Sequence, residues 1–244
     1  MLGVLGGMGP LASADFFTKL VAATPAENDE DHVPVLILSD PRIPHRPPAI
    51  LGNGESPLPA ILARRDQLLA AGATVLAMPC NTAHFWFPQL TADCPVPFIS
   101  IIEASCAEVT ARAAPGDAVG LIATGATLAA HLYDSRLETL GFRVILPDAK
   151  SMDEAVLPAI KRVKQGDAVQ GGQMLEPVVR QLREQGARLI VLACTETPLA
   201  LDAIGSDLRA ECIDTTAALA RACVAHWRAH CAIRLSENLQ HSRP

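Results

Sequence analysis

Short apolar runs alternate with longer amphipathic stretches along almost the whole chain, and this alternation strongly limits the folds open to it. The runs have the length of strands and are apolar nearly throughout, rather than at every second residue. Such runs are typical of strands buried on both faces, as in parallel sheets. The strand-like runs are Leu2–Leu5, Val35–Leu38, Val75–Met78, Phe98–Ile101, Val119–Ala123, Val144–Leu146, Leu189–Leu192 and Cys212–Ile213. The sequence therefore predicts an α/β fold.

Helical patterns fill most of the segments between these runs. Apolar residues recur in them at helical spacing, which is typical of helices that cover one side of a sheet. Pro10 is well placed at the first position of such a helix. The predicted helices are Leu11–Ala23, Leu58–Ala71, Ile102–Ala113, Leu128–Leu140, Glu154–Gln165, Gln173–Gln185 and Thr215–His230. Together with the strand-like runs, they predict mostly parallel sheets flanked by helices.

Two segments share one design, and each contains a cysteine followed by hydrogen-bonding residues. They are Gly72–Thr82, with Cys80, and Gly186–Glu196, with Cys194. Each opens with a Gly-Ala pair, continues through an apolar run and reaches its cysteine at the same spacing. The cysteine then lies where a strand ends and a helix begins, the usual place for ligand sites in open α/β sheets. A helix N-terminus also favours the thiolate. A single cysteine is usually a buried core residue, but the repeated placement predicts a functional pair.

The two cysteine segments are separated by about half the chain, which predicts two similar, pseudo-symmetric lobes. We expect a first lobe from residues 1–97 plus 206–235, and a second lobe from residues 98–205. The helix from Thr215 would return to pack on the first lobe. Residues 236–244 are polar and have no apolar period, so we expect this tail to fray.

Composition and charge argue against several classes of partner. The 244-residue chain has a net charge of −6 and no basic cluster, which argues against nucleic acids and anionic membranes. No apolar run approaches the ~18–20 residues that cross a bilayer, and the N-terminus lacks the pattern of a signal peptide. These observations predict a cytoplasmic enzyme. The seven cysteines are dispersed and form no Cys-x-x-Cys pair, so we expect neither structural disulfides nor a metal site.

Two further segments are suited to binding an anion. Gly6–Pro10 lies between the first strand and a helix, so its amides suit a small carboxylate; a turn without a ligand and a dinucleotide site are the alternatives. The proline-rich stretch Asp40–Pro48 is either a solvated loop or a rigid loop that presents Arg46 to a carboxylate. His84 lies four positions after Cys80 and is a candidate neighbour of that thiol.

Several motifs resemble those of the aspartate racemases in the cofactor-independent aspartate/glutamate racemase family. They are Gly3–Ala12, Met78–His84 and Ala193–Glu196, and the stretches Ile43–Arg46 and Ile50–Glu55 resemble a loop of that family. The paired cysteine motifs are highly specific for the superfamily, and the likeness covers nearly the whole chain up to its C-terminal helix. The Gly-Gly-Met-Gly-Pro opening favours aspartate racemases over glutamate racemases, which have Asp-Ser around this turn.

The resemblance implies a two-lobed enzyme with its active site between the lobes. It implies that Cys80 and Cys194 are acid/base thiols, and that Arg46 and Lys164 bind carboxylates of a small-molecule amino-acid substrate. By pattern alone Lys164 would be a plain surface lysine. The remaining residues that we assign to substrate binding are Met8, Gly9, Asn81, Thr82, Thr124, Thr195 and Glu196. The resemblance also implies a homodimer that needs no cofactor and no metal.

The chemistry of racemisation explains why two thiols are expected. Inversion at Cα removes a proton from one face and delivers one to the other, so a base and an acid are needed on opposite sides. One thiol must start as thiolate, and the two exchange roles when the opposite enantiomer is bound. Without a pyridoxal electron sink, the developing carbanion needs oriented amides and cations near its carboxylate, which the glycine-rich turn and Arg46 are suited to provide.

Several alternatives stay open at this point. Glutamate or a broader range of amino acids is possible as substrate, because one methylene in a pocket changes binding by only ~1–3 kcal/mol. Hydantoin racemases, maleate isomerases and arylmalonate decarboxylases belong to the same superfamily, although the decarboxylases tend to keep only one of the two cysteines. The non-enzymatic alternative is an amino-acid-binding protein whose thiols are merely structural.

Overall fold

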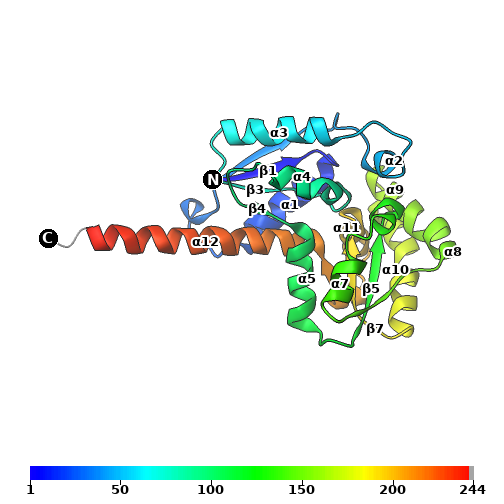
Figure 1. Ribbon diagram of the computed structural model, residues 1–244. Helices are drawn as coiled ribbons and strands as arrows, with labels where there is room; N and C mark the ends of the chain where they lie inside the picture. The colour runs from blue at the N-terminus through cyan, green and yellow to red at the C-terminus, as the bar shows by residue number, and fades with distance from the viewer. Residues whose placement is uncertain (242–244) are drawn as a thin grey trace.

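The chain folds into two lobes, each built on a parallel sheet of four strands, and the predicted α/β class is confirmed (Figure 1). The computed structural model describes residues 1–241, with side chains through residue 230. The first sheet has the order β2-β1-β3-β4, with β1 (Leu2–Gly6), β2 (Val35–Ser39), β3 (Val75–Ala77) and β4 (Phe98–Ile99). The second has the order β6-β5-β7-β8, with β5 (Ala118–Ala123), β6 (Arg143–Ile145), β7 (Ala187–Ala193) and β8 (Cys212–Asp214).

The two sheets share one topology. β1 pairs with β2 and β3, and β5 pairs in the same way with β6 and β7. Every residue of β1 and β5 is buried, which explains why these strands are apolar throughout. The predicted lobe boundaries differ from the sheets at two points. Phe98–Ile99 pairs with β3 in the first sheet, and Cys212–Asp214 pairs with β7 in the second, so the chain changes lobes after β4 and after β8.

The helices of the first lobe cover both faces of its sheet. They are α1 (Pro10–Ala23), α2 (Arg46–Ile50), α3 (Leu58–Ala70) and α4 (Phe87–Thr91), with the 3₁₀ turns η1 (Asp29–Asp31) and η2 (Thr82–Trp86). Pro10 occupies the start of α1, where its missing N–H has no helical partner to lose. Phe16 and Leu20 lie four residues apart on one face of α1 and pack into the core with Leu2 and Val4 of β1.

The second lobe has more helical segments. They are α5 (Ile101–Arg112), α6 (Gly125–Ala129), α7 (Asp134–Thr139), α8 (Ala149–Ser151), the π-helical η3 (Met152–Val156), α9 (Leu157–Lys164), α10 (Ala168–Glu184), α11 (Glu196–Ala203) and η4 (Asp207–Glu211). The face of α10 that includes Leu175, Val179 and Leu182 is buried against α9, α11 and β7. This layer supports the end of β7, where Cys194 lies.

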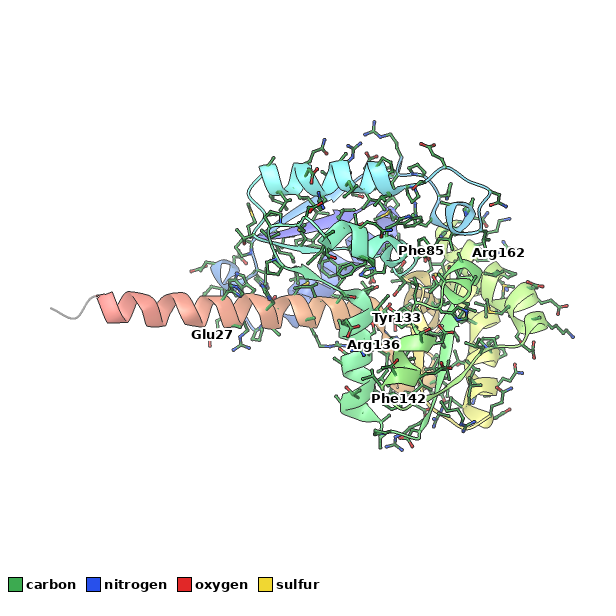
Figure 2. The ribbon with its side chains drawn as sticks, viewed as in Figure 1. Glu27, Phe85, Tyr133, Arg136, Phe142 and Arg162 are labelled. Atoms are coloured by element: carbon green, nitrogen blue, oxygen red, sulfur yellow. The ribbon has the colours of Figure 1, made fainter. Side chains whose placement is uncertain are left out.

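The predicted helix Leu128–Leu140 is wrong, because the segment contains two short helices, α6 and α7. The chain leaves α6 at His131, whose φ of 51° is incompatible with a continuing right-handed helix. The turn places Tyr133 in the core with none of its surface exposed, and Figure 2 shows Tyr133 beside the junction of the lobes. The apolar pattern fits one continuous helix and gives no sign of this break.

The last helix, α12 (Thr215–His241), joins the lobes. It starts directly after β8 of the second sheet and packs on α1 and α5, burying Leu219 and Val224 in the core of the first lobe. Its later turns project away from both lobes (Figure 1). The predicted tail begins inside this helix at Ser236, and residues 242–244 lie outside the described residues. Neither α12 nor another described helix is both long and apolar enough to cross a membrane.

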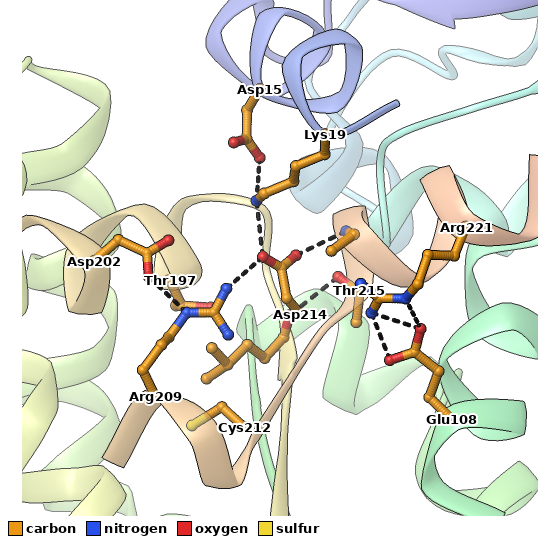
Figure 3. Close-up of polar contacts among 12 residues, drawn as sticks. Asp15, Lys19, Glu108, Thr197, Asp202, Arg209, Cys212, Asp214, Thr215 and Arg221 are labelled. Atoms are coloured by element: carbon orange, nitrogen blue, oxygen red, sulfur yellow. Dashed lines mark hydrogen bonds and ion pairs between the residues drawn. The ribbon is translucent and has the colours of Figure 1, made fainter. Parts of the chain in front are cut away.

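A buried aspartate at the start of α12 connects several elements (Figure 3). The Asp214 carboxylate accepts hydrogen bonds from Lys19 of α1 at 2.8 Å and from Arg209 of η4 at 2.6 Å. It also accepts one from the backbone N–H of Ala217, which caps the helix. Arg209 in turn pairs with Asp202 of α11 at 2.7 Å. The first lobe, the second lobe and the helix that joins them therefore meet at one carboxylate.

Candidate active site

The two predicted thiols lie at equivalent places in the two sheets and line one small pocket. Cys80 follows β3 and Cys194 follows β7, which are the corresponding inner strands. Each cysteine is 5% exposed. From the first lobe the pocket is lined by Met8, Arg46, Pro47, Cys80, Asn81 and Thr82, and from the second by Thr124, Lys164, Cys194, Thr195 and Glu196. Pro47 is the only lining residue that was not among the predicted site residues. Gly9 is the only predicted site residue that does not line this pocket.

His84 supports the turn that carries Cys80 instead of contacting the thiol. Its Nδ1 lies 2.9 Å from the carbonyl oxygen of Cys80, and its Nε2 accepts the backbone N–H of Ile101 at 3.1 Å. Burial lowers the pKa of His84 to about 4. The ring is therefore neutral at pH 7, with its proton on Nδ1 donated to the Cys80 carbonyl.

The side chain of Asn81 links the two cysteine loops. Its Oδ1 accepts the hydroxyl of Tyr133 at 2.5 Å, and its Nδ2 donates to Thr215 Oγ1 at 3.2 Å. The Thr215 hydroxyl donates to the carbonyl of Leu192, two residues before Cys194, at 3.0 Å. Tyr133 and Thr215 were missed in the sequence, where the only signal was that the chain contains a single tyrosine. Asn81 of the first lobe is therefore held by Tyr133 of the second lobe and by Thr215 at the start of α12.

Three threonine hydroxyls contact one another where the two lobes meet beside the pocket. Thr82 Oγ1 of the first lobe lies 3.2 Å from Thr124 Oγ1 and 2.9 Å from Thr127 Oγ1 of the second. Thr124 also caps α6 by accepting the backbone N–H of Thr127. These contacts bring together Thr82 and Thr124, two residues that the family resemblance implies for the substrate pocket.

Cys194 has a carboxylate as its immediate neighbour. Its Sγ lies 3.0 Å from Glu196 Oε2, which also accepts the Thr195 hydroxyl at 3.1 Å. The Lys164 Nζ lies 3.8 Å from the other carboxylate oxygen. Burial, followed by the Glu196 charge, raises the pKa of Cys194 well above its usual range. The expected thiolate-favouring effect of a helix start is therefore outweighed at this position.

Arg46 reaches the pocket from the first turn of α2. Its Nη1 donates to the carbonyls of Ile43 and Pro44 at 3.2 Å and 3.0 Å, and its buried Nε has no hydrogen-bond partner among the described residues. The loop that carries it starts at Asp40, whose carboxylate is held by Arg42 and by Arg64 of α3. These hydrogen bonds from Arg42 and Arg64 lower the pKa of Asp40. The proline-rich stretch is thus anchored at Asp40, although several of its residues are exposed, and from Arg46 onward it forms the start of α2.

One amide of the glycine-rich turn is occupied within the protein. The N–H of Gly7 donates to Ser13 Oγ of α1 at 2.9 Å, so this amide is already occupied. Gly7 has a φ of 92°, and a Cβ there would come within 2.4 Å of the Asp40 backbone, so only glycine fits. Gly9 caps α1, and Met8 extends into the pocket lining.

No group of three or more His, Cys, Asp or Glu side chains among the described residues is arranged to hold a metal ion. The six cysteines whose side chains are described are all free. The site therefore offers two thiols, two cations and one carboxylate for chemistry.

Comparisons with known proteins agree with this architecture. Residues 5–223 match the family model described as Asp/Glu/Hydantoin racemase. The broad specificity amino-acid racemase RacX of Bacillus subtilis is 29% identical over 234 residues, covering 94% of this chain and 99% of that protein. A glutamate racemase of Desulforudis audaxviator is 31% identical over 160 residues, covering 64% of this chain and 56% of its own length.

Solved structures show the same fold. The Picrophilus torridus aspartate racemase superposes with a TM-score of 0.81 at 32% identity, covering 92% of this chain and 93% of that one. An aspartate racemase homologue from Pyrococcus horikoshii superposes with a TM-score of 0.72 at 21% identity, covering 93% of this chain and 98% of that one. The second likeness concerns the fold alone.

Proposed function

This chain belongs to the Asp/Glu/Hydantoin racemase family and is an amino-acid racemase, and we propose that it interconverts L- and D-aspartate with Cys80 and Cys194 as its two acid/base groups. The observation that carries the proposal is the shared pocket of two buried thiols, one from each lobe. One thiolate removes the Cα proton, and the thiol on the other side delivers a proton to the opposite face.

The cations of the pocket support a substrate with two carboxylates. Arg46 comes from the first lobe and Lys164 from the second, and both line the pocket with the thiols. The unpartnered Nε of Arg46 offers a donor for one carboxylate. The positive charges also stabilise the carbanion that forms when Cα loses its proton. Asn81, Thr82, Thr124 and Thr195 complete the polar lining.

A broader substrate range is the second candidate, because the relative from Bacillus subtilis is a broad specificity amino-acid racemase. The test is to incubate the enzyme, without added cofactor, with a panel of L- and D-amino acids and to monitor racemisation by circular dichroism. We expect aspartate to have the largest kcat/KM. Comparable kcat/KM values for several unrelated amino acids would show that the enzyme has a broad substrate range. A higher kcat/KM for glutamate than for aspartate would make glutamate the preferred substrate. A substituted hydantoin and maleate belong in the same panel to test the other superfamily activities.

The same proposal includes independence from metal ions and pyridoxal phosphate. Dialysis against a chelator is expected to leave activity unchanged, and the absorbance spectrum is expected to show no bound pyridoxal. Loss of activity that an added metal restores would contradict this part.

A homodimer is also proposed, in line with the family resemblance. The α1 helix exposes Leu11, Phe17 and Val21, each more than 40% accessible, and such an apolar face suits a subunit interface. Sedimentation equilibrium tests the assembly. A cytoplasmic location stays a prediction of the sequence.

A further inference from the structure

The two thiols of the pocket have chemically different neighbours. The Cys194 sulfur lies 3.0 Å from a carboxylate oxygen of Glu196, and both side chains are buried. At the equivalent place in the first lobe, Cys80 is followed by the neutral amide of Asn81. Among the described residues, no carboxylate hydrogen-bonds to the Cys80 sulfur. The near-symmetry of the lobes therefore does not extend to the charge beside each thiol.

The carboxylate beside Cys194 favours the protonated form of that thiol. An ionised carboxylate only accepts hydrogen bonds, so the contact from Cys194 to Glu196 exists only while the sulfur keeps its proton. Loss of that proton would place two negative charges about 3 Å apart in a buried site, where little water screens them.

The other charged groups near Cys194 do not reverse this preference. Lys164 lies against Glu196 Oε1 at 3.8 Å and is half exposed, so it is screened by solvent. Arg46 enters the same pocket from the opposite lobe, where it donates to the carbonyls of its own loop. Thr195 donates to the same Glu196 oxygen as the thiol and stabilises the ionised carboxylate.

We propose that Glu196 is a positioning residue that keeps Cys194 protonated in the resting enzyme, so that Cys80 supplies the thiolate. The proposal rests on the two-thiol function above and specifies its starting state. The Cys80 thiolate takes the Cα proton, and the Cys194 thiol gives its proton to the opposite face. After the product leaves, Cys194 regains a proton from water and Cys80 loses one to water, which restores the resting form.

The charge at Glu196 is tested by alkylation of each thiol over a range of pH. The protein is treated with iodoacetamide, and the labelled peptides containing Cys80 and Cys194 are quantified by mass spectrometry. In the wild type we expect Cys80 to react faster at every pH. In Glu196→Gln, which keeps the shape but removes the charge, labelling of Cys194 is expected to rise by about tenfold or more at a given pH, since one pKa unit changes the thiolate fraction tenfold. Cys80 is expected to change little.

Matched variants separate the effect of the Glu196 charge from changes in the access of iodoacetamide to the thiols. Glu184→Gln removes the same charge from the exposed end of α10 and is expected to leave both labelling rates unchanged. Glu196→Asp keeps the charge and is expected to restore much of the protection of Cys194. Unchanged labelling of Cys194 in Glu196→Gln, or equal labelling of both thiols in the wild type, would overturn the proposal.

A second measurement does not depend on the Glu196 variants. As the pH is raised, the ultraviolet thiolate absorbance that Cys80→Ser removes from the wild-type curve is expected to appear at lower pH than the absorbance that Cys194→Ser removes, and the reverse order would overturn the assignment. Neither measurement uses a substrate. A failure of the racemisation panel would therefore count against the proposed function alone, while these results report only on the resting protons.

Discussion

The guanidinium of Arg46 shows at the scale of one residue how the site is prepared for an anion. Its Nη1 is fixed by two carbonyls of its own loop, while its buried Nε has no partner among the described residues. A buried donor without a partner costs about 1–3 kcal/mol. Under the proposed function, a substrate carboxylate that accepts this hydrogen bond would remove that cost and so bind more tightly.

Arg46→Lys is expected to lower kcat/KM for aspartate roughly 10- to 100-fold. The lysine keeps the charge but loses the planar fork, and a hydrogen bond to a charged group contributes about 1.5–3 kcal/mol. Steady-state kinetics measure the loss. Arg180→Lys on α10 is the matched control, because its side chain is 52% exposed, pairs with Asp207 and lies outside the pocket lining. A wild-type kcat/KM in Arg46→Lys would remove Arg46 from the site.

The two thiols are tested one at a time. Cys80→Ser and Cys194→Ser are each expected to abolish racemisation, because a serine hydroxyl is far too weak an acid to replace either the thiolate base or the thiol acid. In D₂O, any residual exchange is expected to be confined to L-substrate in one variant and to D-substrate in the other, as followed by NMR. Cys94→Ser, outside the pocket lining, is the control that should keep activity. Full racemisation by either active-site variant would refute the two-base mechanism.

At the scale of secondary-structure elements, the strands were predictable and their connections were less so. The apolar runs located β3 and β7, because burial on both faces leaves little choice of residue. The spacing of apolar residues predicts one helix over Leu128–Leu140, because it carries no signal of the break at His131. The same break explains why Tyr133 was missed as a partner of Asn81, since a contact between lobes has no local pattern.

Thr215 and Thr216 offer a direct comparison at the start of α12. Thr215 bridges Asn81 and the Leu192 carbonyl, whereas the buried Thr216 hydroxyl has no hydrogen-bond partner among the described residues. Thr215→Val is expected to lower the free energy of unfolding by about 1–3 kcal/mol and to lower kcat, because two buried polar groups lose a partner. Thr216→Val is expected to be neutral or slightly stabilising. Urea unfolding and kinetics check both, and equal effects would contradict the bridging role.

At the scale of the whole molecule, the site depends on how two lobes are held together. The sequence located the cysteines in the two halves of the chain, and the family resemblance implied a site between the lobes. The contacts that fix the lobes were not predictable, because Lys19 is far in sequence from Arg209 and Asp214, and all three residues are ordinary in pattern. Lys164 was identified only through the resemblance, although the structure brings it to the pocket.

Asp214→Asn is expected to destabilise the protein by about 3–5 kcal/mol, because it leaves Lys19 and Arg209 without their shared buried carboxylate. Burial alone would raise the pKa of Asp214, but Lys19, the Ala217 amide and Arg209 together lower it. The unfolded chain then binds this proton more readily, so the stabilisation is present above the ordinary carboxyl pKa and is lost as the pH falls below it.

Urea unfolding at several pH values measures this effect. The wild type is expected to lose stability more steeply than Asp214→Asn as the solution becomes acidic. Asp202→Asn, which removes a more exposed partner of Arg209, is expected to cost less. Equal stability of Asp214→Asn and the wild type at neutral pH would show that the carboxylate does not hold the lobes.

The unequal neighbours of Cys80 and Cys194 have a consequence for the kinetics of the two directions. Mirror-image amino acids have the same free energy in water, so the equilibrium constant of racemisation is one. The ratio of forward to reverse kcat/KM equals that constant and is therefore also one at every pH, however asymmetric the pocket is. The asymmetry of the pocket can therefore appear only as equal proportional differences between the two enantiomers in kcat and in KM. An enantiomer that has the lower KM must be turned over more slowly by the same factor.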